Sequence, residues 1–135
     1  MRKMLLPLVL ISWGCGTPSL KPVEIDPADM CSFCRMAVSQ MRYAAEIVDH
    51  DENVHKFDDI GCMVRFLRAR RPGGAAVFVR DYAGGEWIDA REARYVRSDT
   101  IPSPMGGHLI ALKDKSTAED YARQFRGAVL RWENL

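Results

Sequence analysis

Two thiols and a thioether stand within six residues of one another, in the motif Cys31-Ser32-Phe33-Cys34-Arg35-Met36. Thiolate and thioether sulfurs are soft ligands that favour Cu(I), whereas carboxylates and carbonyls suit magnesium, calcium or manganese. The methionine discriminates further, because zinc is held by Cys, His, Asp and Glu rather than by a thioether. The motif therefore predicts a soft-metal site, with Cu(I) as the favoured ion.

Two other uses of the Cys31 and Cys34 pair remain open from the residues alone. A thiol-disulfide oxidoreductase would place Cys-x-x-Cys at the start of a helix that follows a buried strand, but here the Pro-containing, acidic stretch 21–30 precedes it. The second alternative is a structural disulfide or a structural zinc site. Zinc needs four protein ligands, and Cys62 is the one further thiol of the expected mature chain outside the motif.

The N-terminus predicts the compartment. Two basic residues precede the apolar run 4–11, as in a secretory signal, and this run is too short to span a membrane. The following Ser-Trp-Gly-Cys sequence resembles a bacterial lipoprotein signal, although an ordinary cleaved signal is the alternative. We expect residues 1–14 to be the signal peptide, Cys15 to be the lipidated first mature residue, and residues 15–29 to be a flexible tether.

Composition limits the remaining classes of function. The expected mature chain is long enough for one domain or two closely joined small halves. The formal net charge of the whole chain is +1, so its global charge indicates neither nucleic-acid binding nor attraction to anionic lipid. The sequence shows no nucleophile paired with His and a carboxylate, no phosphate loop and no zinc-hydrolase motif, which predicts a protein that is not an enzyme.

The first half of the expected domain predicts a β-β-α-β order. Residues 43–48 and 54–57 are predicted to form a hairpin around a polar turn. Asp58 and Asp59 are suited to cap a helix that begins at Ile60 and ends near Arg70. The buried face of this helix and the strand after it are predicted to contain Met63, Phe66, Leu67 and the run 75–79.

The second half predicts the same order. Strands are expected at 93–97 and 107–112, followed by a helix from Thr117 to Arg126 that Ser116 caps and Gly127 ends, and by a closing strand at 128–132. The predicted fold class is α+β, with two tandem β-β-α-β units, about 31–80 and 87–135, whose small sheets pack against helices. Together they would form one metal-binding domain over residues 30–135.

These pieces resemble the NosL family, copper-binding lipoproteins that are accessory to nitrous-oxide reductase. The resemblance covers most of the expected mature chain, and the matching segments occur in order: Cys15, the 31–36 motif, Lys56-Phe57-Asp58-Asp59, Trp87-Ile88-Asp89-Ala90 and Ser103-Pro104-Met105-Gly106-Gly107-His108. It implies a tandem β-β-α-β fold and a lipid-anchored periplasmic protein. It also implies delivery of Cu(I) to nitrous-oxide reductase, together with membrane assembly proteins.

The resemblance assigns copper ligands residue by residue: Cys31, Cys34, Met36 and Met105. The family usually has Gly between the second Cys and the Met, where this chain has Arg35. If that glycine serves a positive φ angle, Arg35 must adopt a backbone conformation that is unfavourable for a side chain with a Cβ atom.

The remaining candidates have a structural explanation beside the functional one. Met105 lies between prolines and glycines in a rigid stretch that can present a ligand, but methionine also fills apolar gaps. His108 is a further candidate ligand, or an exposed residue at the start of a strand. Cys62 is predicted to be a small buried apolar residue of the first helix, and Asp58 and Asp59 to be capping residues without a metal role.

Overall fold

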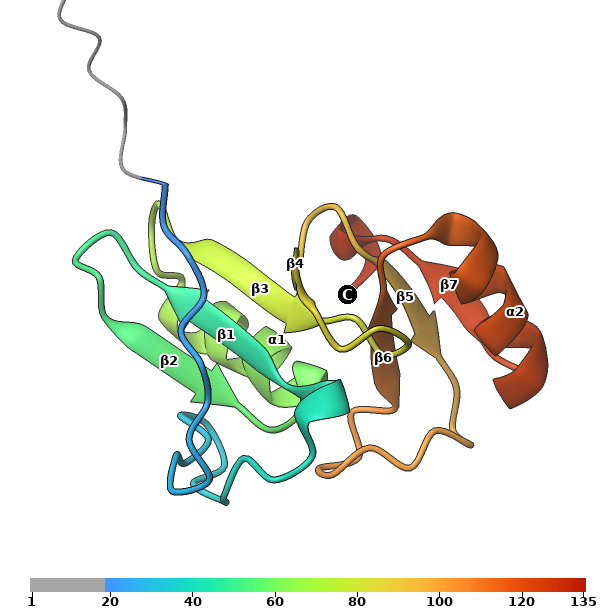
Figure 1. Ribbon diagram of the computed structural model, residues 1–135, viewed down its shortest axis with the longest axis horizontal. Helices are drawn as coiled ribbons and strands as arrows, with labels where there is room; N and C mark the ends of the chain where they lie inside the picture. The colour runs from blue at the N-terminus through green and yellow to red at the C-terminus, as the bar shows by residue number, and fades with distance from the viewer. Residues whose placement is uncertain (1–18) are drawn as a thin grey trace, which may run out of the picture.

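The computed structural model describes residues 19–135, so the expected signal peptide and the expected lipid-bearing Cys15 lie outside the described residues. Two small antiparallel sheets, each accompanied by one α-helix, stand side by side and share a core (Figure 1). Over the range 19–135, neither helix has the length and apolar character that crossing a bilayer requires. The architecture is α+β, as predicted.

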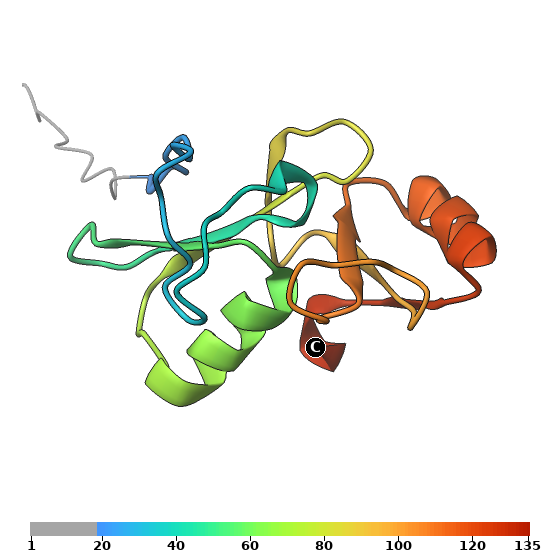
Figure 2. The ribbon, with the colours of Figure 1, turned by 90° about the horizontal axis from the view of Figure 1, so that it is seen from below.

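The first sheet has the strand order β2-β1-β3-β4. Its central strand β1 (Ala45–Val48) pairs antiparallel with β2 (Val54–Phe57) and β3 (Ala76–Arg80), and α1 (Ile60–Arg70) covers one face (Figure 2). The predicted hairpin and helix are therefore confirmed. Strand β4 (Trp87–Asp89) was not predicted as a strand, and it extends this first sheet by pairing with β3, although its residues fall in the range expected for the second unit.

The second sheet has the strand order β6-β5-β7. Strand β5 (Arg94–Arg97) pairs antiparallel with β6 (Leu109–Leu112) and with β7 (Ala128–Leu130), and α2 (Lys115–Phe125) connects β6 to β7. In each sheet the first strand of the unit lies between the second and the third. The two units thus repeat one β-β-α-β topology, which confirms the tandem arrangement.

Several boundaries of the second unit differ from the prediction, and β6 begins at Leu109 rather than at Gly107. Helix α2 begins two residues earlier than expected, with Asp114 rather than Ser116 as its N-cap, because the Ala118 amide already bonds the Asp114 carbonyl at 3.0 Å. Ser116 therefore lies inside the first turn. The last strand is shorter than expected, since the chain turns into the 3₁₀-helix η2 (Trp132–Asn134). A second such turn, η1 (Met41–Tyr43), precedes β1.

The segment before the cysteine motif is held against the first sheet, on the side opposite α1 (Figure 2). The Val23 amide donates to the Glu46 carboxylate at 2.7 Å. Lys56 Nζ donates to the Glu24 carbonyl at 3.1 Å, and Arg80 contacts the Glu24 carboxylate at 3.2 Å. The expectation of a flexible tether up to residue 29 is thus wrong for this part of it, because polar side chains of the sheet bind its backbone.

Glu46 makes the stability of this contact depend on pH. Its side chain is fully buried and one carboxylate oxygen has no partner among the described residues, so burial raises the pKa of Glu46 above its ordinary value. The stability that the protonated form contributes is present at acid pH and is lost as the pH rises through the raised pKa.

We expect Glu46→Gln to gain stability relative to the wild type between mildly acidic and neutral pH, measured by chemical denaturation. A difference independent of pH would contradict this.

A loop of the second unit packs across the start of α1. The buried Asp59 carboxylate caps the helix by accepting from the Gly61 amide at 2.6 Å, and it also accepts from the Met105 amide at 2.9 Å and the Gly107 amide at 3.3 Å. A Cβ atom on Gly61 would lie 2.8 Å from the Gly107 Cα, closer than real contacts allow. Glycine is therefore required where the two units meet.

We expect Gly61→Ala to lower the free energy of unfolding by about 1–3 kcal/mol, because an added methyl group would force the loop away from the helix. Gly73→Ala is the matched control, since its Cβ would meet no atom within 4 Å. That variant should stay within about 0.5 kcal/mol of the wild type in chemical denaturation. Equal stabilities for the two variants would show that the close approach is absent.

Candidate metal centre

The motif forms a closed loop that turns its second cysteine back onto its first. The Cys31 amide donates to the Met36 carbonyl at 2.7 Å, and the Arg35 amide donates to the Cys31 carbonyl at 3.0 Å. Inside this loop the Cys34 amide points at the Cys31 sulfur, 3.5 Å away. The loop does not begin a helix, in contrast to the usual setting of a redox dithiol.

The loop is fixed to the first sheet. The Ser32 amide donates to the Lys56 carbonyl of β2 at 2.8 Å, and the Lys56 side chain pairs with Asp29 just before the motif. Phe33 stays 40 % exposed, with the Arg65 guanidinium of α1 5.8 Å from its ring centre. The thiols are thus held at the end of β2, where the chain enters α1.

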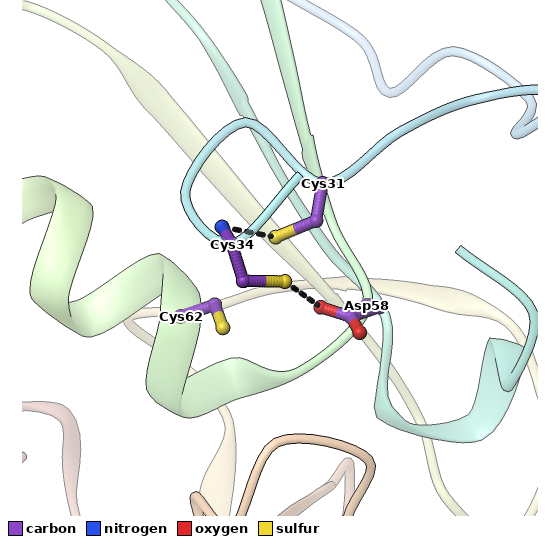
Figure 3. Close-up of side chains that lie close together, drawn as sticks. All are labelled: Cys31, Cys34, Asp58 and Cys62. Atoms are coloured by element: carbon purple, nitrogen blue, oxygen red, sulfur yellow. Dashed lines mark hydrogen bonds between the residues drawn. The ribbon is translucent and has the colours of Figure 1, made fainter. Parts of the chain in front are cut away.

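Four potential ligand groups converge at this place (Figure 3). The sulfurs of Cys31, Cys34 and Cys62 and a carboxylate oxygen of Asp58 all lie within 4.8 Å of one another. They come from the motif loop, from the connection between β2 and α1, and from the first turn of α1. Cys34 donates to Asp58 Oδ1 at 3.5 Å, and all three cysteines are free thiols.

Among the three cysteines of the cluster, Cys31 is the one that carries negative charge. The hydrogen bond from Cys62 and the amides around the sulfur hold the pKa of Cys31 well below its ordinary value, in spite of burial. The contact with Cys31, together with burial, raises the pKa of Cys62, and burial raises the pKa of Cys34. Burial, with the nearby Cys31 sulfur, also raises the pKa of Asp58 to about 6. At neutral pH the cluster therefore contains one thiolate, Cys31, and two thiols, Cys34 and Cys62.

The structure adds two residues to the predicted set. Cys62 is fully buried as expected, but its thiol also belongs to the cluster. Asp58 is 3 % exposed and faces the cysteines, so the cap of α1 is Asp59 alone. A signal for Cys62 was present in the sequence, because a cysteine in the first turn of a helix lies where the helix dipole favours a thiolate.

The four-group cluster consists of thiols and a carboxylate, and the ligand role of the two predicted thioethers stays a prediction. Met36 is 58 % exposed, and its carbonyl closes the motif loop. Met105 is half-buried against the first core, and its amide is held by Asp59, the neighbour of Asp58. The fold thus brings the Met105 loop to the helix start that also positions Cys62.

His108 is not part of the four-group cluster. Its Nδ1 lies 3.0 Å from the Ile101 carbonyl, its amide donates to Ser103 Oγ at 2.8 Å, and its φ angle is 54°. These contacts hold the ring within its own loop. Its role as a copper ligand also stays a prediction.

The donor set suits a soft d¹⁰ ion. Three sulfurs favour Cu(I), but three sulfurs with one carboxylate also match a tetrahedral zinc site. The sequence argument against zinc depended on a missing fourth protein ligand, and Asp58 supplies that group. The four groups therefore admit both ions, and the exposed thioether of Met36 in the same motif is the feature that favours copper.

The comparisons with known proteins identify the family. A family model described as NosL matches residues 22–135. The chain belongs to the NosL family. A NosL relative from Stutzerimonas stutzeri, a "Copper-binding lipoprotein NosL", is 26% identical over 137 residues, covering 90% of this chain and 72% of the relative. The NosL fold is shared with the crystal structure of a "copper chaperone NosL" from Shewanella denitrificans, with a TM-score of 0.79, 22% identity, and coverage of 87% of this chain and 97% of that one.

In this NosL-family chain, Arg35 stands where the family pattern usually has glycine, and its φ angle is 67°. The expected positive φ is therefore present. A left-handed conformation costs a residue with a Cβ atom about 1–2 kcal/mol. We expect Arg35→Gly to be about 1 kcal/mol more stable than Arg35→Ala in chemical denaturation.

Arg65 provides the matched control for this comparison, because it is an exposed residue inside α1. There the order should reverse, with the glycine variant about 1 kcal/mol less stable than the alanine variant. The same order at both positions would show that Arg35 carries no backbone strain.

Proposed function

We propose that this chain is a periplasmic Cu(I) metallochaperone, anchored to a membrane through lipid on Cys15, that delivers copper for the maturation of nitrous-oxide reductase. Its chemistry is the binding and release of an ion, not the catalysis of a reaction. The observation that carries the proposal is a preformed group of free thiols that is open at one side, where Cys34 is partly exposed and Met36 projects into solvent.

The proposed ligands are Cys31, Cys34, Met36 and Met105, with His108 as a further candidate. The two thiols are already neighbours in the structure. Cu(I) needs only two or three ligands, so the ion can bind without engaging all of them at once. An exposed thioether then leaves room for a ligand of the recipient.

Transfer is proposed to proceed by ligand exchange. A ligand of the recipient forms a bond to Cu(I) on the exposed side, and a bond to one of the chain's sulfurs then breaks. The ion remains Cu(I) and no electron moves. The recipients in this proposal are nitrous-oxide reductase and its membrane assembly proteins.

The names of the relatives support this proposal. The Stutzerimonas stutzeri protein is named as a copper-binding lipoprotein and the Shewanella denitrificans protein as a copper chaperone. The first name supports the lipid anchor proposed here, and both support a copper cargo.

The thiol-disulfide oxidoreductase alternative fits the geometry less well. Such an enzyme needs an accessible thiol of low pKa as its nucleophile. In this site the thiol with the lowered pKa, Cys31, is fully buried, whereas the more accessible Cys34 has a raised pKa. The arrangement shields the thiolate instead of exposing it.

We expect the domain without residues 1–15 to bind one Cu(I) tightly in an anaerobic titration against a chromophoric chelator. Cys31→Ser/Cys34→Ser should abolish tight binding, because it removes both sulfur ligands that the cysteines of the motif provide. Met36→Ala and Met105→Ala should each weaken binding measurably.

Met63→Leu is the matched control for the methionine variants, because it removes a buried thioether of the α1 core and nearly keeps the volume. It should leave the Cu(I) affinity unchanged. A Cu(I) affinity that is unchanged in Met36→Ala and Met105→Ala would remove both residues from the ligand set. Absence of Cu(I) binding by the unmodified domain would refute the copper proposal itself.

A further inference from the structure

A third thiol reaches the motif from a different element of the fold. Cys62 lies in the first turn of α1 and is fully buried, yet its sulfur belongs to the same group as those of Cys31 and Cys34 (Figure 3). Neither the motif nor the names of the relatives assign it a role. Its position follows from the two-residue connection between β2 and α1, which brings the helix start under the loop.

The spacing of the three sulfurs is close to that of a coordinated ion. With a metal–sulfur bond of about 2.3 Å, the value for zinc thiolates, the sulfurs of a three-coordinate planar site lie about 4 Å apart. The sulfurs here all lie within 4.8 Å of one another. A contraction of less than about 1 Å would therefore bring them to the spacing of a coordinated ion.

We propose that Cys62 supplies the third thiolate of an inner copper position, together with Cys31 and Cys34. This inference rests on the proposed function and assigns different roles, retention and release, to different ligands. Cys31 and Cys62, both without solvent exposure, retain the ion, whereas the partly exposed Cys34 and the exposed Met36 form its route to the recipient. Copper moves along this gradient of exposure.

The surroundings of Cys62 support a ligand over a purely apolar residue. The N-terminus of the 11-residue helix α1 contributes positive potential, which offsets the negative charge of thiolates bound to one monovalent ion. The group that acts in the opposite direction is the buried carboxylate of Asp58, which accepts a hydrogen bond from Cys34. Cu(I) has little affinity for this hard oxygen, whereas zinc accepts it as a fourth ligand.

The test uses the full chain carrying Cys15→Ser, so that Cys31, Cys34 and Cys62 are its three remaining cysteines. X-ray absorption at the copper edge counts the sulfur ligands of the bound ion. Competition with a chromophoric Cu(I) chelator gives the affinity, and the rate of copper loss to that chelator gives the retention. Each is measured for the parent chain, for Cys62→Ala and for the near-isosteric Cys62→Ser.

We expect both variants to lose one sulfur ligand, to bind Cu(I) at least about ten-fold more weakly and to release it faster, since even changes around a ligand cost about 10–100-fold in affinity. Met63→Leu, at the next buried position of α1, should change none of the three readouts. Thermal unfolding of the copper-free proteins shows whether the variants fold. If Cys62→Ala does not fold, the near-isosteric Cys62→Ser provides the test.

Two results would overturn the inference. One is an unchanged sulfur count and affinity in a folded Cys62 variant while Cys31→Ser/Cys34→Ser abolishes binding, which would leave the copper proposal intact and Cys62 as a packing residue. The other is a weaker affinity for Zn²⁺ in Asp58→Asn combined with preferential binding of Zn²⁺ over Cu(I) by the parent chain. That result would assign the inner position to zinc and overturn the inference, while the Cu(I) titration of the unmodified domain decides the proposed function separately.

Discussion

The buried carboxylate of Asp59 accepts hydrogen bonds from backbone amides of both halves of the molecule. Its bond to Gly61 sets the first residue of α1, and its bonds to Met105 and Gly107 hold the loop of the second unit against that helix. Because α1 begins there, Cys62 falls in the first turn and Asp58 lies directly before the cap. The geometry of the thiol cluster therefore depends on one capping interaction, which also joins the two units.

The two units share more than their strand order. Two residues connect the second strand to the helix in each unit, and the second of them is an aspartate N-cap, Asp59 in the first unit and Asp114 in the second. In the second unit, however, this cap makes no side-chain hydrogen bond, and Lys113 and Thr117 stand where the first unit has Asp58 and Cys62. In both units the helix begins close to the end of the preceding strand. Side chains that can bind a soft metal occupy this place only in the first unit, so the fold is repeated but the candidate metal site is not.

The proposed site would combine retention with access, because its candidate ligands differ in exposure. Buried thiols protect a soft ion from water and from chelators, but they also slow its release. An exposed thioether provides an approach for another protein, but it binds weakly when it stands alone. The motif loop places both kinds of sulfur within six residues, and its tight closure requires the positive φ angle at Arg35. The strain at this position is the cost of a turn short enough to bring Cys34 back to Cys31.

Periodicity and turn chemistry were sufficient to predict the β1–β2 hairpin, α1, the repeated strand order and the pairing of Cys31 with Cys34, since these features depend on neighbours within a few residues. Strand β4, the earlier start of α2 and the attachment of residues 23–24 to the sheet were missed, because a three-residue strand and a strap held by Glu46 carry little local pattern. By itself, the sequence determined that two thiols and a thioether would share a loop, which predicts a soft-metal site. Only the tertiary structure decided that Cys62 and Asp58 join them, because residues 24 or more positions apart meet only where packing and a buried cap bring a helix start under the loop.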